Sequence, residues 1–85
     1  MSGYKVFLKR SAEKELDSLP EKIHSRIINR LLSLKENPRP KNAKKLRGRS
    51  GLRIRVSDYR ILYTLDDSEK KIEVYSIGHR KDIYR

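Results

Sequence analysis

The chain has 85 residues, no cysteine and a formal net charge of +11. This length favours a single domain over residues 1–85 with a thin core, and only 35% of the residues are hydrophobic. The lack of cysteine excludes disulfides and thiolate zinc sites, and no apolar run is long enough to span a membrane, so we expect a cytoplasmic protein with no membrane partner.

The first third of the chain predicts a strand followed by two helices. In Tyr4–Arg10 the apolar residues Tyr4, Val6 and Leu8 alternate with Lys5, Phe7 and Lys9, which is typical of a strand. Ser11 is a suitable N-cap for a short first helix, which Pro20 ends. The residues of this helix that should face inward are Ala12, Leu16 and Leu19.

A second helix is predicted to start at Pro20, and the segment Glu36–Pro40 ends it at Pro38. Its apolar stripe has helical spacing and consists of Ile23, Ile27, Leu31 and Leu34, widened by Ile28 and Leu32. The two helices should form a hairpin with a shared buried side. A basic linker follows over Pro38–Gly51, with a brief strand-like piece near Lys45–Leu46.

Three strands are predicted next, and they are Leu52–Val56, Tyr59–Leu65 and Lys71–Ile77. A turn at Ser57–Asp58 pairs Val56 with Tyr59, Arg55 with Arg60, and Ile54 with Ile61. A loop at Asp66–Glu69 pairs Tyr63 with Ile72, Ile61 with Val74, and Arg60 with Tyr75. The face under the helices then holds Ile54, Val56, Tyr59, Ile61, Tyr63, Ile72 and Val74. The open face holds Arg53, Arg55, Arg60, Leu62, Glu73 and Tyr75.

The C-terminal segment Gly78–Arg85 is expected to leave the third strand toward the open face, because Gly78 permits a sharp change of direction. His79, Arg80 and Tyr84 would then join that face. The predicted fold class is α+β: a strand, a two-helix hairpin, a three-stranded antiparallel meander that joins the first strand in one sheet, and a short C-terminal helix or extension.

Positive charge is concentrated between residues 39 and 60, where nine basic residues accompany one acidic residue, Asp58. Such a segment suits a polyanion. Arginine donates two parallel hydrogen bonds to phosphate, and aromatic rings beside it suit unstacked bases, so the open face predicts a site for RNA phosphate. The structural alternative is the solvated outer face of an antiparallel sheet.

Cleavage of RNA by attack of its own 2′-OH needs charge stabilisation at phosphorus and two proton transfers. The arginines can supply the first without a metal, and the sequence has no metal-ligand cluster and no phosphate loop, so no cofactor is expected. The acid–base candidates are His79 and Tyr84. Either His79 is the base, or the rate comes mainly from positioning and charge stabilisation.

Three motifs, "KKLRG" (Lys44–Gly48), "LRIRVSDYRILY" (Leu52–Tyr63) and "IGHRKDIYR" (Ile77–Arg85), resemble the RelE branch of the RelE/ParE toxin superfamily. The resemblance extends over nearly the whole chain. It implies a metal-independent endoribonuclease that cuts mRNA in the ribosomal A site and is neutralised by a RelB-like antitoxin. In that family, lysines are common where Arg53 and Arg55 stand here.

The catalytic residues that the motif match implies are Arg53, Arg55, Arg60, Arg80 and Tyr84, with His79 as a further candidate. Additional RNA contacts are expected from Lys44, Lys45, Arg47, Arg49, Tyr75 and Lys81. The expected partners are the antitoxin, mRNA and ribosomal RNA. Two alternatives stay open: a ParE-like inhibitor of DNA gyrase, and an RNA-binding module without catalysis.

Overall fold

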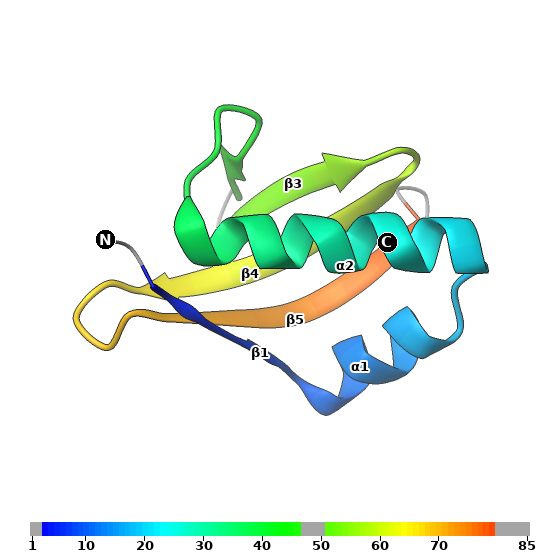
Figure 1. Ribbon diagram of the computed structural model, residues 1–85, viewed down its shortest axis with the longest axis horizontal. Coiled ribbons are helices and arrows are strands. Elements are labelled where there is room, and N and C mark those ends of the chain that lie inside the picture. Colours follow the sequence, from blue (N-terminus) through cyan, green and yellow to red (C-terminus); the bar gives the residue numbers. More distant parts are fainter. Residues whose placement is uncertain (1–2, 47–50, 80–85) are drawn as a thin grey trace.

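The computed structural model describes residues 3–46 and 51–79, and within them two helices cover one face of a five-stranded sheet (Figure 1). The elements are β1 (Lys5–Leu8), α1 (Arg10–Asp17), α2 (Glu21–Glu36), β2 (Lys44–Lys45), β3 (Leu52–Val56), β4 (Tyr59–Asp66) and β5 (Lys71–His79). The strand order is β1-β5-β4-β3-β2, with β1 parallel to β5 and the other neighbours antiparallel. The predicted α+β class is confirmed. The strand-like piece in the linker is present as β2, one residue before its expected place.

The helices are where the apolar spacing places them, but α1 begins earlier than predicted. Its N-cap is Lys9, with extended backbone and no side-chain cap bond, so the prediction of Ser11 as N-cap is wrong. The hydrogen bond from the Lys9 amide to the Val74 carbonyl, 2.8 Å, holds the chain to β5 up to the residue where α1 starts. Pro20 is the N-cap of α2, directly before the first helical residue.

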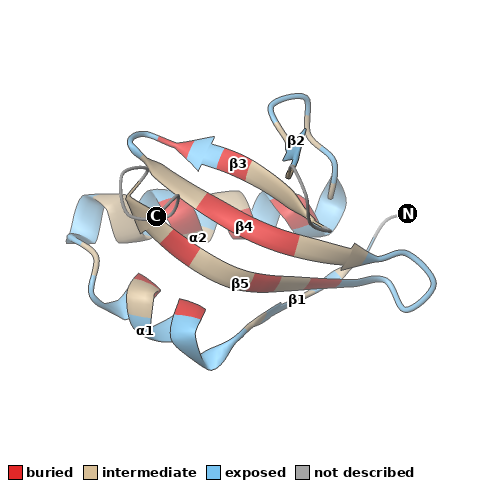
Figure 2. Ribbon diagram, turned by 180° about the vertical axis from the view of Figure 1, so that it is seen from behind, coloured by how far each residue is buried: buried red, intermediate tan, exposed pale blue. Residues whose placement is uncertain are grey.

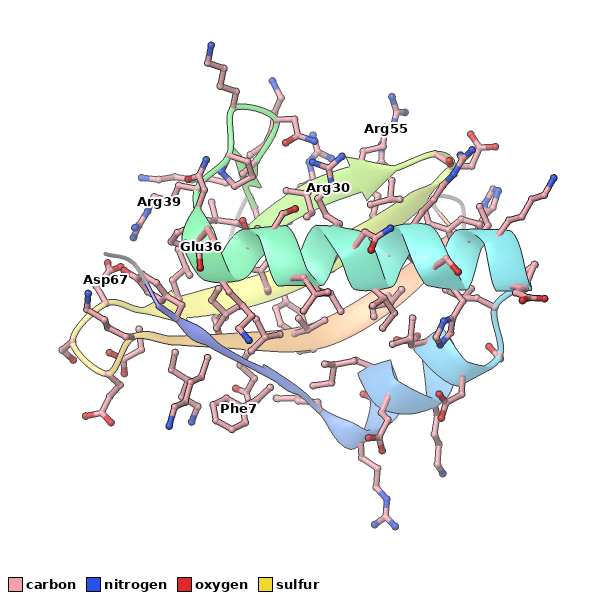
Figure 3. The ribbon with its side chains drawn as sticks, in the orientation of Figure 1. Phe7, Arg30, Glu36, Arg39, Arg55 and Asp67 are labelled. Carbon is pink, nitrogen blue, oxygen red and sulfur yellow. The ribbon has the colours of Figure 1, made fainter. Side chains whose placement is uncertain are left out.

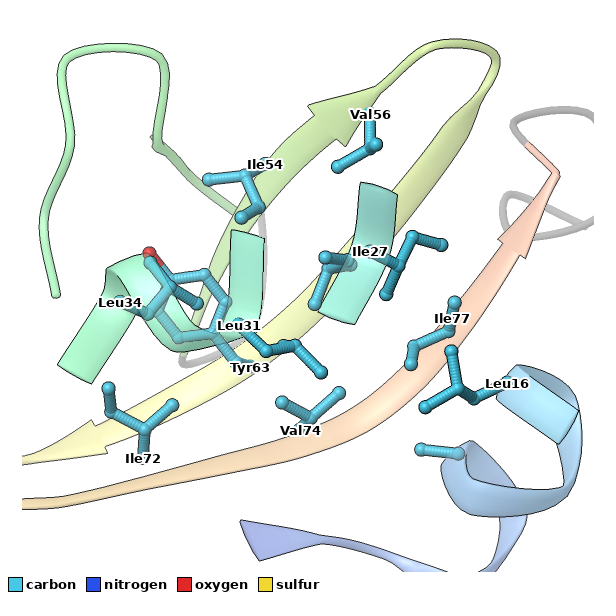
Figure 4. Close-up of a cluster of buried hydrophobic side chains, with 12 residues drawn as sticks. Leu16, Ile27, Leu31, Leu34, Ile54, Val56, Tyr63, Ile72, Val74 and Ile77 are labelled. Atoms are coloured by element: carbon cyan, nitrogen blue, oxygen red, sulfur yellow. The ribbon is translucent and has the colours of Figure 1, made fainter. Parts of the chain in front are cut away.

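The core lies between α2, α1 and the inner face of the sheet (Figure 4). Its buried residues are Ala12, Leu16, Ile27, Leu31, Leu34, Ile54, Val56, Ile61, Tyr63, Ile72, Val74 and Ile77. Tyr63 is fully buried, and burial raises the pKa of its hydroxyl to about 12 while that hydroxyl donates a hydrogen bond to the Pro38 carbonyl at 2.8 Å. Leu32 departs from the predicted inward stripe and is 54% exposed.

The β3–β4 hairpin has the predicted register. Arg55 pairs with Arg60, Ile54 with Ile61, and the strands are joined through Ser57 and Asp58. A two-residue connection between alternating strands permits only this pairing, because a slip by one residue would move the apolar side chains to the other face. Ser57 has a positive φ of 57°, which is uncommon for a residue other than glycine.

The β4–β5 register differs from the prediction. Tyr63 pairs with Val74 rather than Ile72, because Asp66 is still paired with Lys71 and the loop is displaced by one residue. The Asp66 carboxylate accepts bonds from the Ser68 hydroxyl and the Glu69 amide, and this fixes the start of the turn. Moving the loop by one residue shifts the partner of each β4 residue by two positions along β5. The same side chains therefore still point to the inner face, because the side-chain period of a strand is two.

A β-bulge adds a second shift farther along β5. The register changes between Leu62 and Tyr63 of β4, which face Ser76 and Val74, and Tyr75 is the extra residue. Ile61 therefore pairs with Ile77 rather than Val74, and Ile77 becomes a core residue that alternation did not predict. The Ile77 amide donates to Glu15 Oε1 of α1 at 2.9 Å.

The predicted turn at Gly78 is also wrong, because Gly78 and His79 continue β5. Gly78 pairs with Arg60 in place of the predicted Tyr75, and His79 pairs with Tyr59. The segment expected to fold over the open face thus starts no earlier than residue 80, which is outside the described residues together with the expected C-terminal helix or extension.

The N-terminus, the linker and the β4–β5 turn meet at Asp67, as the left side of Figure 3 shows for Arg39 and Asp67. Arg39 donates two bonds to the Asp67 carboxylate, at 2.8 and 3.1 Å, and the Tyr4 hydroxyl donates a third at 2.6 Å. These hydrogen bonds, that of Arg39 first, lower the pKa of Asp67 to about 2. None of the helices in the part of the chain that the structure describes could cross a membrane.

Candidate phosphate-binding site

The register places the arginines of the β3–β4 hairpin on the sheet face away from the helices. Figure 2 shows the backbone of the sheet from that side. The side chains of Arg53, Arg55 and Arg60 alternate with the core residues Ile54, Val56 and Ile61 along the two strands. A shallow pocket of about 270 Å³ forms among them. The residues that line it are Asn42, Lys44, Arg53, Arg55 and Arg60. The structure thus places the three predicted hairpin arginines together.

The electrostatics of this pocket are one-sided, because none of the described residues that line it is acidic. Arg55 and Arg60 are direct cross-strand partners, and opposed like charges destabilise a sheet. A phosphate bound between them would compensate both charges through charge-assisted hydrogen bonds. The arrangement therefore suits an anion with several acceptor oxygens.

The basic linker contributes to the pocket through β2. Lys44 pairs with Arg53, so its side chain shares the open face, while Lys45 pairs with Leu52 on the side of the core. Lys44 and Asn42 line the pocket, but Lys45 does not. Sequence reasoning missed Asn42, because a single amide in a basic linker does not stand out. The available signal was its position two residues before Lys44, since residues two apart in an extended chain share a face.

Tyr75 and His79, the two predicted site residues of β5, lie on opposite faces of the sheet. Tyr75 stays on the open face at the bulge, and its hydroxyl is buried without a hydrogen-bond partner within the described parts of the chain. His79 lies on the helix-covered face, because it pairs with Tyr59, whose ring it meets edge-on at 5.4 Å between centroids. The expectation that His79 joins the arginines is therefore wrong. The predicted residues outside the described ranges are Arg47, Arg49, Arg80, Lys81 and Tyr84.

One further open-face residue departs from expectation. Leu62 lies on the open face, as predicted, but it is only 4% exposed. It belongs to the central strand β4, between Arg53 of β3 and Ser76 of β5. The open face thus has a buried apolar centre beside its arginines and is not simply a solvated outer surface.

The chemistry that the pocket supports is recognition and charge stabilisation of phosphate. Guanidinium groups stay protonated, so they stabilise negative charge but do not transfer protons. Lys44 contributes an ammonium group that can donate a proton. Within residues 3–46 and 51–79 there is no group of three or more His, Cys, Asp or Glu side chains that could bind a metal ion.

Comparison with known proteins identifies the class. The family model described as "ParE toxin of type II toxin-antitoxin system, parDE" matches residues 6–84. Toxin RelE of Mycobacterium tuberculosis is 32% identical over 84 residues, which are 96% of this chain and 87% of that protein. The chain therefore belongs to the RelE/ParE family of toxins from type II toxin–antitoxin systems.

Solved structures place it beside the RelE members of this family. The toxin of the RelBE2 toxin–antitoxin complex from Mycobacterium tuberculosis superposes with a TM-score of 0.81 at 26% identity, over 92% of this chain and 99% of that one. The toxin of the archaeal RelE–RelB complex from Pyrococcus horikoshii superposes with a TM-score of 0.81 at 27% identity, over 92% of this chain and 96% of that one. The toxin of the intact Escherichia coli RelBE complex superposes with a TM-score of 0.78 at 28% identity, over 89% of this chain and 95% of that one.

Proposed function

We propose that this toxin is a ribosome-dependent endoribonuclease that cleaves mRNA in the ribosomal A site and so inhibits translation. The observation that supports the proposal most directly is the pocket of Arg53, Arg55, Arg60 and Lys44 on the open face of the sheet. Four cationic side chains converge on this pocket, and such a cluster suits the negative charge of a phosphodiester. The RelE relatives support the same reading.

In the proposed reaction, the 2′-oxygen attacks the adjacent phosphorus and the bond from phosphorus to the 5′-oxygen breaks. The products are a 2′,3′-cyclic phosphate and a 5′-hydroxyl. Arg55 and Arg60 approach the phosphate from facing strands and stabilise the charge that builds up on its oxygens. The 2′-OH gives its proton to solvent water, and the leaving 5′-oxygen gains one.

Lys44 is the proposed donor of that second proton. Its side chain lines the pocket, and an ammonium group, unlike a guanidinium, can give up a proton to an alkoxide. We assign no general base among the described pocket residues, because His79 is on the opposite face. Arg80 and Tyr84 remain proposed members of the site from the motif match.

We propose a RelB-like antitoxin as the cognate partner, with mRNA and ribosomal RNA as the bound nucleic acids. The three solved relatives described above are toxin–antitoxin complexes, and the charge of +11 on this chain favours an acidic binding segment. Purified toxin should gain thermal stability when the antitoxin is added. No gain at a saturating concentration would contradict this partner.

The decisive experiment is primer extension on ribosome-bound mRNA after induced expression of the toxin. We expect cuts within codons for the wild type and at least a hundredfold loss of cutting for Arg60→Ala, while Lys41→Ala in the linker serves as a matched charge control. Full activity of Arg60→Ala would contradict the proposed site.

Lys44 is tested by two substitutions. Lys44→Arg keeps the positive charge but cannot donate a proton, whereas Lys44→Gln loses both. If Lys44 is the acid, both variants should lose cleavage by about a hundredfold, which is a typical contribution of general acid catalysis. Retention of cleavage in Lys44→Arg, but not in Lys44→Gln, would show that Lys44 only binds phosphate.

A ParE-like inhibitor of DNA gyrase is the second candidate, and the ParE description of the matching family model favours it. In that case expression would leave mRNA intact and produce filamentation and DNA damage. A non-catalytic RNA-binding module would bind ribosomes with strong salt dependence and would cut nothing.

A further inference from the structure

A second basic pocket, of about 460 Å³, lies between α2 and the β3–β4 turn. Its lining residues are Arg26, Asn29, Arg30, Ser33, Arg55, Val56 and Ser57. Figure 3 shows Arg30 of α2 and Arg55 of β3 extending on the same side of the molecule. Nothing in the proposed cleavage reaction uses the α2 residues of this pocket.

The pocket has charge without compensation. Within the described ranges, no carboxylate lines it and no ion pair joins Arg26, Arg30 or Arg55 to an acid. Arg26 and Arg30 are four residues apart on one helix, where like charges destabilise the helix. A bound anion would reverse this cost.

One arginine of the pocket is held in place by a neutral group. Arg26 Nη1 donates a 2.7 Å hydrogen bond to Ser57 Oγ, so the guanidinium is positioned while its charge remains. Ser57 itself adopts a left-handed backbone conformation, with φ at 57°. A positive φ at this position is what a two-residue hairpin turn requires, so the turn fixes the Ser57 hydroxyl beside α2.

The second pocket is connected to the first through Arg55, which lines both. Arg55 is exposed at the edge of the hairpin between the open face and α2. A chain with evenly spaced phosphates could therefore pass from one pocket to the other. Amide and hydroxyl groups of Asn29 and Ser33 add neutral partners for phosphate or ribose oxygens.

We propose that the Arg26–Arg30–Arg55 pocket binds a second phosphate of an RNA backbone and so extends the binding track beyond the cleavage site. This rests on the proposed function in that the RNA is the one the toxin meets on the ribosome. The phosphate comes either from the mRNA beside the cut or from ribosomal RNA.

The test compares Arg26→Gln/Arg30→Gln with Lys22→Gln/Lys35→Gln. Both variants lose two positive charges from exposed or half-buried positions of α2, but neither control lysine lines the pocket. Affinity is measured against increasing salt with two probes: a single-stranded oligoribonucleotide with methylated 2′-hydroxyls, which cannot be cleaved, and purified small ribosomal subunits.

We expect the arginine variant to bind about tenfold more weakly and its salt slope to fall by about 0.7, the value for one lost phosphate contact on a single strand. The control should bind within about twofold of the wild type. A loss with the oligoribonucleotide assigns the pocket to mRNA, and a loss only with the subunits assigns it to ribosomal RNA.

Equal losses in both variants would overturn the proposal, because they would reflect net charge rather than a pocket. No loss with either probe would also overturn it, as would a loss seen only in affinity for the antitoxin. Binding is measured without cleavage, so a wild-type protein that binds normally but cuts no mRNA would remove the proposed function and leave this pocket standing.

Discussion

Arg55→Gln should make the unliganded toxin more stable while it weakens its activity. Arg55 directly opposes Arg60 across the hairpin, and such like-charge pairs cost roughly 0.2–1 kcal/mol. With about 0.5 kcal/mol relieved, and 4–8 °C per kcal/mol for a domain of this size, the melting temperature should rise by about 3 °C. Cleavage of ribosome-bound mRNA should fall at least tenfold.

The assay is thermal unfolding of the free toxin at low and high salt, with Lys41→Gln as the control for loss of one charge. Lys41 is exposed in the linker and has no cross-strand partner among the residues that the structure describes. The gain of Arg55→Gln should largely vanish at 1 M salt, where the screening length is about 3 Å. If Arg55→Gln melts below both the wild type and Lys41→Gln at low salt, the repulsion argument is refuted.

Three further predictions concern stability. Hydrogen bonding from Arg39 lowers the pKa of Asp67 to about 2, so its contribution is present above pH 4 and lost as the pH falls toward 2; the difference in urea stability between wild type and Asp67→Asn should shrink over that range. Glu15→Leu removes the acceptor of the Ile77 amide and should cost about 1–3 kcal/mol in urea unfolding, whereas Glu15→Gln keeps an acceptor oxygen and should cost less. Gly51→Ala should destabilise by more than about 1 kcal/mol in the same assay, because φ is 121° and the new Cβ would lie 2.9 Å from a carbonyl oxygen of β4. A difference between wild type and Asp67→Asn that does not change with pH would contradict the first prediction. Wild-type stability of Glu15→Leu or of Gly51→Ala would contradict the second or the third.

The hairpin and its arginines were predictable because two constraints agree there. The two-residue turn and the strict alternation of Ile54 and Val56 with arginines leave one register, so the opposition of Arg55 and Arg60 follows from sequence. The helical stripe of α2 was predictable from its spacing, apart from Leu32, which lies at the margin of the stripe and is exposed.

The register of the β4–β5 pair could not be predicted from the apolar pattern. A shift by two residues preserves the faces, so the apolar pattern cannot detect it. The bulge did leave a signal, because the buried residues Ile72, Val74 and Ile77 change their spacing from two to three. The assignment of His79 to the open face came from a separate error, because Gly78 was expected to turn the chain and instead continues β5 together with His79.

The bulge also determines which residue of β5 stands beside the arginines. In a regular continuation of β5 past Val74, Ile77 and His79 would share the open face. Because of the extra residue Tyr75, both side chains lie on the helix side instead. There the Glu15 carboxylate accepts a hydrogen bond from the Ile77 amide. Gly78 is left opposite Arg60, and it has no side chain to compete with a phosphate for that guanidinium. The bulge therefore places a glycine, rather than Ile77, opposite Arg60 on the open face.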